Sequence, residues 1–211
     1  MKNFPDGGFY FITDTSKSIP EHVADVEHAL QAGCTFVQYR EKQQPTRSMI
    51  ERAEALRRIC QGKAGFLIND RIDVALAVDA DGVHLGHNDM PLGLARRLLG
   101  KDKIIGLTVR TLDDAKDAEE KGADYIALGP IFPSLTKADI GPACGPALIA
   151  EVKQHVSLPL VAIGGITLSN APSVLDAGAD FLAAISSVMG SENVRGTISE
   201  FESLIKGYKK P

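Results

Sequence analysis

The chain has 211 residues, a hydrophobic content of 44% and a formal net charge of −4 at pH 7, which together indicate one globular domain spanning residues 1–211. The acidic balance argues against nucleic-acid and membrane-surface partners, because both favour basic protein faces. No apolar run approaches the roughly 20 residues that span a bilayer, and the first residues lack a secretory signal pattern. The three cysteines match no zinc or redox spacing, so a reducing cytoplasm is the expected location.

Eight short apolar runs alternate along the chain with segments of helical periodicity. The runs cover residues 9–12, 37–42, 66–70, 83–89, 105–108, 126–130, 161–165 and 182–187. Five of them end in polar residues, whereas 126–130 ends in Gly-Pro and 161–165 in Gly-Gly. Continuous apolar runs of this length predict strands buried on both faces, as in a parallel sheet. Helical spacing of apolar residues predicts surface helices over 23–30, 49–59, 92–99, 115–120, 148–156, 171–175 and 194–205.

A short signal precedes every second predicted strand, at residues 32–36, 79–82, 122–125 and 178–181. Gly33, Gly122 and Gly178 stand where the end of a helix requires a positive φ. Eight strand–helix units that repeat in pairs predict a single-domain (β/α)8 TIM barrel. A doubly wound open sheet is the alternative, but it usually has a glycine-rich loop after the first strand, where this chain has Thr-Asp-Thr at 13–15.

Glycines follow the seventh predicted strand, and serines follow the eighth. Barrels often bind phosphate between these two strand ends, because backbone N–H groups converge there. Gly165 would let the backbone approach the anion, and Ser186 would donate hydrogen bonds. In the alternative interpretation, Gly164 and Gly165 only turn the chain, and Ser186 and Ser187 only cap a helix.

Two aspartates follow neighbouring predicted strands. Asp70 ends the third strand and Asp89 lies just beyond the fourth, so a barrel places them side by side. Two carboxylates with room for water and phosphate oxygens suit Mg²⁺. Alternatively, Asp70 caps a helix that begins near Ile72, and Asp89 opens a turn before Pro91.

Basic side chains accompany these carboxylates. Strand alternation places Gln38, Arg40 and Lys42 on one side of the second strand and its extension. Lys137 lies in the longest irregular segment, 132–146, and segments of that length are usually functional. Three cations and a divalent ion match a diphosphate, with neutral donors from Asn69, Thr108, Ser134 and Thr136. A solvated surface run is the alternative for residues 40–42.

One phosphate site and one Mg²⁺–diphosphate site indicate a two-substrate transfer, with diphosphate leaving against Mg²⁺ and the three cations. His84 lies within the fourth predicted strand and fits a core role as well as a catalytic one. The other histidines considered, His22, His28 and His155, fall on predicted helices and are expected to face solvent.

The ordered motifs resemble those of the thiamine phosphate synthase family over about residues 9–205. They are Tyr-Phe-Ile-Thr-Asp at 10–14, Val-Gln-Tyr-Arg-Glu-Lys at 37–42, Leu-Ile-Asn-Asp-Arg at 67–71, Asp-Gly-Val-His-Leu-Gly at 81–86, Asn-Asp-Met-Pro at 88–91, Ile-Gly-Leu-Thr at 105–108, Gly-Pro-Ile-Phe-Pro-Ser-Leu-Thr-Lys at 129–137 and Ala-Ile-Gly-Gly-Ile at 162–166. Single motifs occur in other phosphate-binding barrels, whereas the ordered set is specific to this family.

The resemblance implies a barrel enzyme, an alkyl/aryl transferase that joins hydroxymethylpyrimidine diphosphate to thiazole phosphate, carboxylated or not. The products are thiamine phosphate and diphosphate. The family's chemistry is dissociative: diphosphate leaves first, and the thiazole nitrogen attacks a pyrimidine-stabilised carbocation. Carried over by motif, Asp70 and Asp89 would hold Mg²⁺, and Arg40, Lys42 and Lys137 would be catalytic.

The same resemblance assigns two sets of substrate contacts. The pyrimidine diphosphate would meet Gln38, Arg40, Lys42, Asn69, Thr108 and Lys137. The thiazole phosphate would meet Ser134, Thr136, Gly165, Ile185 and Ser186. This chain departs from the family pattern with Tyr39 where Leu is commoner, Thr108 where Ser is commoner, and Arg110 where His is frequent.

Three rivals share parts of this pattern. A thiazole tautomerase needs a phosphate site and a proton shuttle but no Mg²⁺–diphosphate site, and a non-catalytic phosphate-binding paralogue needs neither the metal nor the cations. Ribulose-phosphate epimerase requires two metal-binding histidines that this chain does not place. The expected partners are therefore the two small-molecule substrates, and a homo-oligomer is compatible with the sequence.

Overall fold

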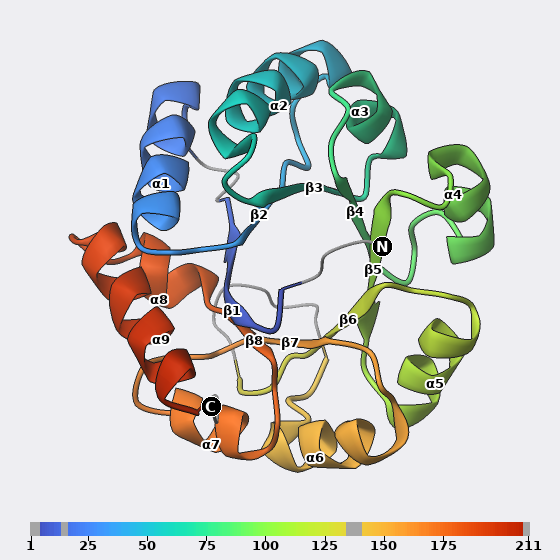
Figure 1. Ribbon diagram of the computed structural model, residues 1–211, viewed down its shortest axis with the longest axis vertical. Coiled ribbons are helices and arrows are strands. Elements are labelled where there is room, and N and C mark those ends of the chain that lie inside the picture. Colours follow the sequence, from blue (N-terminus) through green and yellow to red (C-terminus); the bar gives the residue numbers. More distant parts are fainter. Residues whose placement is uncertain (1–4, 14–16, 134–140, 209–211) are drawn as a thin grey trace.

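The strands of the computed structural model, which describes residues 5–13, 17–133 and 141–208, close into a parallel barrel in sequence order (Figure 1). The strands are β1 (Gly8–Ile12), β2 (Phe36–Tyr39), β3 (Gly65–Asn69), β4 (Gly82–Leu85), β5 (Ile104–Val109), β6 (Tyr125–Leu128), β7 (Leu160–Ile163) and β8 (Phe181–Ala183). Because β8 pairs with β1, the barrel prediction is confirmed and the open-sheet alternative is wrong.

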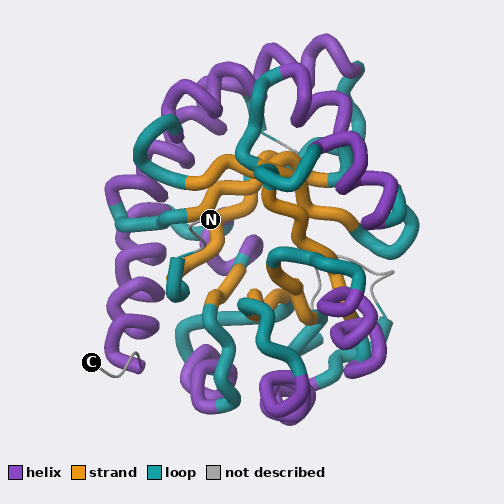
Figure 2. Tube along the Cα trace, turned by 45° about the vertical axis from the view of Figure 1, so that its right-hand side comes forward, coloured by secondary structure: helices purple, strands orange, loops and turns teal. Residues whose placement is uncertain are grey.

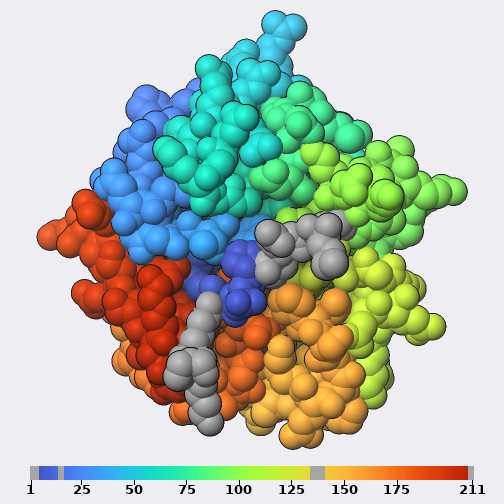
Figure 3. All heavy atoms as spheres, viewed as in Figure 1, coloured from blue at the N-terminus to red at the C-terminus, as the bar shows by residue number. Residues whose placement is uncertain are grey.

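Nine helices of the described residues surround the strands, and in Figure 3 their side chains cover the outside of the barrel. They are α1 (Ile19–Gln31), α2 (Thr46–Cys60), α3 (Ile72–Ala77), α4 (Leu92–Leu99), α5 (Leu112–Glu120), α6 (Gly145–His155), α7 (Ala171–Asp176), α8 (Ile185–Met189) and α9 (Val194–Tyr208). In these described helices, no segment is long and apolar enough to cross a membrane.

Strand side chains alternate between two separate cores. Phe9 and Phe11 of β1 pack outward beneath the helices, whereas Tyr10 points into the barrel. Glycines on neighbouring strands make room for the inward aromatic rings. A Cβ at Gly106 would lie 2.0 Å from the ring of Tyr125, its register partner on β6. Interior volume, and not only chain flexibility, therefore requires this glycine.

Helix boundaries follow local sequence signals. Gly33, Gly122 and Gly178 have the expected positive φ values of 102°, 81° and 97°, and Asp79 takes the corresponding place with a φ of 50°. The predicted 148–156 helix begins earlier, at Gly145, because Pro146 is well accommodated in a first turn. His22 is fully buried beside Tyr39, so the expectation that it faces solvent is wrong.

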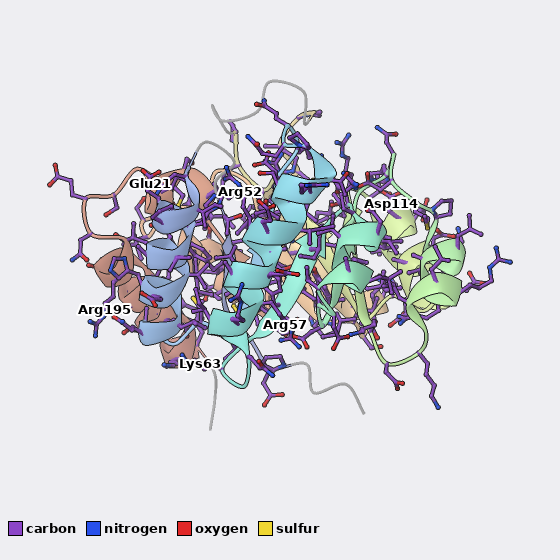
Figure 4. The ribbon with its side chains drawn as sticks, turned by 90° about the horizontal axis from the view of Figure 1, so that it is seen from above. Glu21, Arg52, Arg57, Lys63, Asp114 and Arg195 are labelled. Atoms are coloured by element: carbon purple, nitrogen blue, oxygen red, sulfur yellow. The ribbon has the colours of Figure 1, made fainter. Side chains whose placement is uncertain are left out.

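The two ends of the barrel differ in chemistry. The parallel strands run toward the end at which the following helices begin. Figure 2 shows in teal the loops that join the strands to the surrounding helices. Figure 4 shows Glu21 and Asp114, in the first turns of α1 and α5, toward this end. Lys63, which follows α2, lies toward the opposite end. The carboxyl ends of the strands are therefore grouped at one mouth of the barrel.

A carboxylate contact that occurs three times stabilises the opposite end of the barrel, where the strands begin. Asp81, Asp124 and Asp180 each stand directly before an even-numbered strand, and each accepts an N–H at the start of the preceding strand. Each also pairs with a cation from the helix before that strand. The N–H donors are Phe66, Ile105 and Leu160, and the cations are Arg57, Arg96 and Lys153.

The remaining quarter of the barrel, formed by β1 and β2, has no such aspartate. Thr35 occupies the aspartate's place before β2, and its buried hydroxyl has no hydrogen-bond partner among the described residues. The carboxylate comes instead from Glu202 on α9, whose Oε1 accepts the Phe9 N–H at 2.9 Å. Lys206, one turn along α9, lies 3.9 Å from Glu202. The sequence repeat before every second strand thus corresponds to a fourfold structural device.

Candidate active site

A pocket opens at the carboxyl ends of the strands and brings together many of the expected site residues. Its lining includes the following members of the expected substrate-binding set: Gln38, Arg40, Asn69, Thr108, Gly165, Ile185 and Ser186. Lys42, Asp70 and Asp89 lie beside β2, β3 and β4 at the same end. Ser134, Thr136 and Lys137 lie outside the described residues, so their roles stay predictions.

The end of β2 is held by the end of β1. The backbone N–H of Arg40 donates to Thr13 Oγ1 at 3.0 Å. The backbone N–H of Thr13 donates in turn to the Gln38 carbonyl at 3.0 Å. Thr13 is buried, so water does not compete for these bonds. This arrangement fixes the point from which the Arg40 side chain enters the pocket.

Glu41 is buried between the two cations of the 40–42 segment, with only 3% of its surface exposed. Its Oε1 accepts the backbone N–H groups of Lys42 at 2.8 Å and Gln43 at 2.9 Å. A solvated surface run, the alternative interpretation of this segment, does not account for a buried carboxylate. The side chain shapes the turn that carries Lys42.

Asp70 has a left-handed backbone conformation, with a φ of 63°, which is unusual for a non-glycine residue. Its Oδ2 lies 2.8 Å from Lys42 Nζ. Burial alone would raise the pKa of Asp70, but hydrogen bonds from Asp89 and Lys42 lower it. The N-cap of α3 is Arg71, so the alternative in which Asp70 caps this helix is wrong.

Asp89 approaches Asp70 from the loop after β4. Its Oδ2 accepts the Gly86 N–H at 2.7 Å, so it closes a turn as well as facing Asp70. Burial, followed by the hydrogen bond with Asp70, raises the pKa of Asp89. A hydrogen bond between two carboxyl groups requires a shared proton, and a divalent cation could replace that proton.

These two carboxylates fit Mg²⁺. Among the residues that the structure describes, no cluster of three or more His, Cys, Asp or Glu side chains forms a closed metal cage. Mg²⁺ prefers one or two carboxylates together with waters and substrate phosphates. The Asp70–Asp89 pair beside an open pocket supplies such an incomplete oxygen set.

The far side of the pocket is built from the ends of β7 and β8. Gly164 and Gly165 have positive φ values of 99° and 64°, and a Cβ on Gly165 would lie 2.6 Å from the Pro133 carbonyl oxygen. The glycines therefore allow close chain packing as well as access to a ligand. The two serines differ, because Ser187 donates to the Ile166 carbonyl whereas Ser186 lines the pocket.

The pocket is also lined by side chains that were not among the expected site residues. Tyr10 and Tyr125 line it from β1 and β6, and their hydroxyls lie 2.8 Å apart. His84 bonds Tyr125 through Nδ1 and Thr108 through Nε2, so it points into the barrel with both ring nitrogens paired. Arg110 lines the pocket after β5. The apolar-run pattern placed Tyr10 in a predicted strand and Tyr125 directly before one, but it could not tell the barrel interior from the helix layer.

Comparison with known proteins bears directly on this site. A family model described as "Thiamine monophosphate synthase" matches residues 9–188. The chain belongs to the thiamine monophosphate synthase family. The family and fold predictions are confirmed, and with them the prediction of a thiamine-biosynthetic transferase.

Individual relatives of this synthase family match nearly the whole chain. The thiamine-phosphate synthase of Methanosarcina barkeri is 52% identical over 202 residues, covering 96% of this chain and 92% of the relative. That of Methanosarcina mazei is 50% identical over 204 residues, covering 97% and 85%. The structure of thiamine phosphate pyrophosphorylase from Pyrococcus furiosus superposes with a TM-score of 0.88 at 40% identity, covering 97% of this chain and 98% of that one.

Proposed function

We propose that the pocket joins 4-amino-2-methyl-5-hydroxymethylpyrimidine diphosphate to 4-methyl-5-(2-phosphoethyl)thiazole, releasing diphosphate and forming thiamine phosphate. The observation that carries the assignment is the meeting of Lys42, Asp70 and Asp89 beside the Arg40 pocket in a chain of this family. Cations for a leaving diphosphate and an oxygen pair for Mg²⁺ occur at one place, as the transfer requires.

The bond changes need little acid–base chemistry from the protein. The bond between the pyrimidine methylene carbon and the diphosphate oxygen breaks, and its electron pair leaves with the diphosphate. The thiazole nitrogen then gives its lone pair to the methylene carbon, so no proton has to move. Arg40 and Lys42 would stabilise the charge that grows on the diphosphate. Lys137 is proposed as a third cation, from its position in the family motif.

Asp70 and Asp89 would hold Mg²⁺ at the diphosphate end of the pocket. When bound, the ion would neutralise phosphate oxygens that the two lysines and Arg40 do not reach. Lys42 links the proposed metal ligands to the proposed diphosphate cations, because it is itself one of these cations and is paired with Asp70. It follows the buried Glu41 in the chain. Substrate binding would therefore let Lys42 exchange Asp70 for a phosphate oxygen.

The remaining contacts divide between the two substrates. Gln38, Asn69 and Thr108 would contact the pyrimidine ring, since they lie on the pocket walls formed by β2, β3 and β5. Gly165, Ile185 and Ser186 would hold the thiazole phosphate on the opposite wall, with Ser134 and Thr136 as proposed additional donors. A cytoplasmic location and a homo-oligomer stay predictions from the sequence.

Metal-dependent activity of matched aspartate variants tests this proposal. Asp89→Asn and Asp70→Asn should each lower kcat/KM by at least about a hundredfold, and EDTA should abolish activity of the wild type. Asp73→Asn, which neutralises an exposed aspartate paired with Arg71 on α3, is the matched control and should retain activity. A tautomerase would instead convert thiazole phosphate without the pyrimidine and without metal. Conversion without the pyrimidine, or activity without metal, would overturn the proposal.

A further inference from the structure

A continuous chain of hydrogen bonds crosses the floor of the pocket from β2 to β5. Gln38 Nε2 donates to the Tyr10 hydroxyl at 2.9 Å, and that hydroxyl lies 2.8 Å from the hydroxyl of Tyr125. Tyr125 is 2.8 Å from His84 Nδ1, and His84 Nε2 is 2.9 Å from Thr108 Oγ1. Both ends of the chain, Gln38 and Thr108, line the pocket.

The orientation of the Gln38 amide sets the donor-to-acceptor direction of this chain of hydrogen bonds. Because Gln38 donates to Tyr10, the Tyr10 hydroxyl can direct its own proton at Tyr125. Tyr125 then donates to Nδ1 of His84, which leaves the imidazole proton on Nε2 to reach Thr108. In the reverse order the buried Tyr10 proton would have no acceptor among the described residues.

The direction decides what the two ends present to a ligand. The amide nitrogen of Gln38 donates to Tyr10, so its carbonyl oxygen is the atom left to accept from a ligand in the pocket. Thr108 Oγ1 accepts from His84, so its own O–H is left to donate to a ligand. Between them, Asn69 Nδ2 is buried without a hydrogen-bond partner in the described part of the chain, and it also lines the pocket.

The pattern of one acceptor and two donors complements an aromatic ring that carries an amino group next to a ring nitrogen. The amino group would donate to Gln38, and ring nitrogens would accept from Thr108 or Asn69. A ring with an oxo group in place of the amino group presents an acceptor and a ring N–H there, which reverses the pattern. Sites that pair every buried polar group strongly reject ligands that leave one unpaired.

We propose that Tyr10, Tyr125 and His84 are positioning residues that hold this polarity and thereby select a 4-aminopyrimidine over its 4-oxo counterpart. None of the three needs to touch the reacting atoms. The inference rests on the proposed function, because it concerns the pyrimidine end of the same pocket.

The surroundings of the chain keep its polarity fixed. Tyr10, Gln38, His84 and Tyr125 are all buried, so bulk water does not offer alternative partners. The His84 ring stacks on Tyr125 with a centroid distance of 5.6 Å, which holds the imidazole plane. Burial raises the pKa of both tyrosines, so each hydroxyl keeps the proton that it donates.

Selectivity between two pyrimidine diphosphates tests the proposal. Tyr125→Phe removes one hydroxyl from the middle of the chain, so the Gln38 amide is free to rotate and offer its nitrogen to the ligand. We expect the ratio of kcat/KM for the 4-amino over the 4-oxo compound to fall at least about tenfold. Tyr10→Phe interrupts the same chain and should give the same fall if Tyr125→Phe does not fold.

Tyr39→Phe is the matched control, because it removes a buried hydroxyl from β2 that takes no part in this chain. Its selectivity should equal that of the wild type. The Kd values of both compounds, measured by calorimetry, give the same ratio independently of turnover. A wild-type ratio in both tyrosine variants would overturn the inference alone, whereas a wild type that binds the amino compound selectively but forms no product would overturn the proposed function alone.

Discussion

The ammonium nitrogen of Lys42 lies 2.8 Å from Oδ2 of Asp70, so a cation proposed for the diphosphate is paired with a carboxylate proposed for the metal. The Lys42 side chain is about half exposed, which leaves it free to move when either ligand arrives. The pair couples the two binding events, because each ligand competes for a partner of the other.

Removing the Lys42 charge should therefore have opposite effects on the two ligands. In Lys42→Met, Mg²⁺ without substrate should bind a few-fold more tightly, since an exposed ion pair contributes about 0.2–1 kcal/mol. The KM for the pyrimidine diphosphate should rise about tenfold or more, because a charge-assisted contact to phosphate is lost. Calorimetry and steady-state kinetics measure these values, and Lys17→Met, whose partner is Asp25, is the control. An equal loss of affinity for Mg²⁺ and for the pyrimidine diphosphate would contradict the coupling.

The interaction between Asp70 and Asp89 should make metal binding depend on pH. Burial and the bond to Asp70 raise the pKa of Asp89, and below that pKa Mg²⁺ must displace a proton to bind. Affinity should therefore rise with pH through the raised pKa of Asp89 and become constant above it. Calorimetry in buffers of different ionisation enthalpy should detect proton release below that plateau. An affinity that does not change as the pH falls through this range would be inconsistent with a shared proton.

Glu41 should act on substrate affinity through the backbone. Glu41→Ala removes the acceptor for the Lys42 and Gln43 N–H groups, so the turn that carries Lys42 loses its support. We expect the KM for the pyrimidine diphosphate to rise about tenfold, with a smaller change in kcat. Glu41→Gln keeps one carbonyl acceptor and should restore much of the affinity. If both variants lost affinity equally, the charge of Glu41 and not its hydrogen bonds would be responsible.

The pattern of strand ends predicted that polar residues after neighbouring strands share one mouth of the barrel. It could not predict the backbone and side-chain conformations at that mouth. Arg40, Asn69 and Thr108 follow or end apolar runs, so a closed parallel barrel had to gather them at one mouth. The left-handed backbone of Asp70 has no counterpart in a periodicity pattern. Neither does the interaction of Asp70 with Asp89, because it depends on a side-chain contact across two loops.

The residues of the pocket floor could not be predicted from the sequence for a different reason. Tyr10 and Tyr125 alternate with apolar residues in strands that are buried on both faces, so composition does not separate the barrel interior from the helix layer. Only the register that sets Gly106 opposite Tyr125 shows which side each ring occupies. His22 illustrates the same difficulty on α1, where a polar residue on a helix proved to be buried.

The contact of Glu202 with Phe9, at the end of the barrel opposite the pocket, gives a prediction for stability. Glu202→Ala leaves the Phe9 N–H without its acceptor and should lower the free energy of unfolding by about 1.5–3 kcal/mol. Thr35→Asp introduces a carboxylate where the other three quarters have one. It should destabilise the wild type, because it places a second carboxyl group where Glu202 already accepts the Phe9 N–H, but stabilise Glu202→Ala.

Chemical denaturation of the two single variants and the double variant measures this coupling as a double-mutant cycle. Glu200→Ala, at an exposed position of the same helix, is the control and should change stability little. Additive effects of the two substitutions would show that Thr35 and Glu202 do not serve the same backbone group.

The account depends most directly on the products formed from the two proposed substrates. The measurement is a time course of thiamine phosphate and diphosphate, with both substrates and Mg²⁺ and with each component omitted in turn. We predict equal amounts of the two products at every time point, and no thiamine phosphate when the thiazole phosphate, the pyrimidine diphosphate or the metal is left out. Conversion of the thiazole phosphate alone, or product formation that survives removal of the metal, would contradict the account.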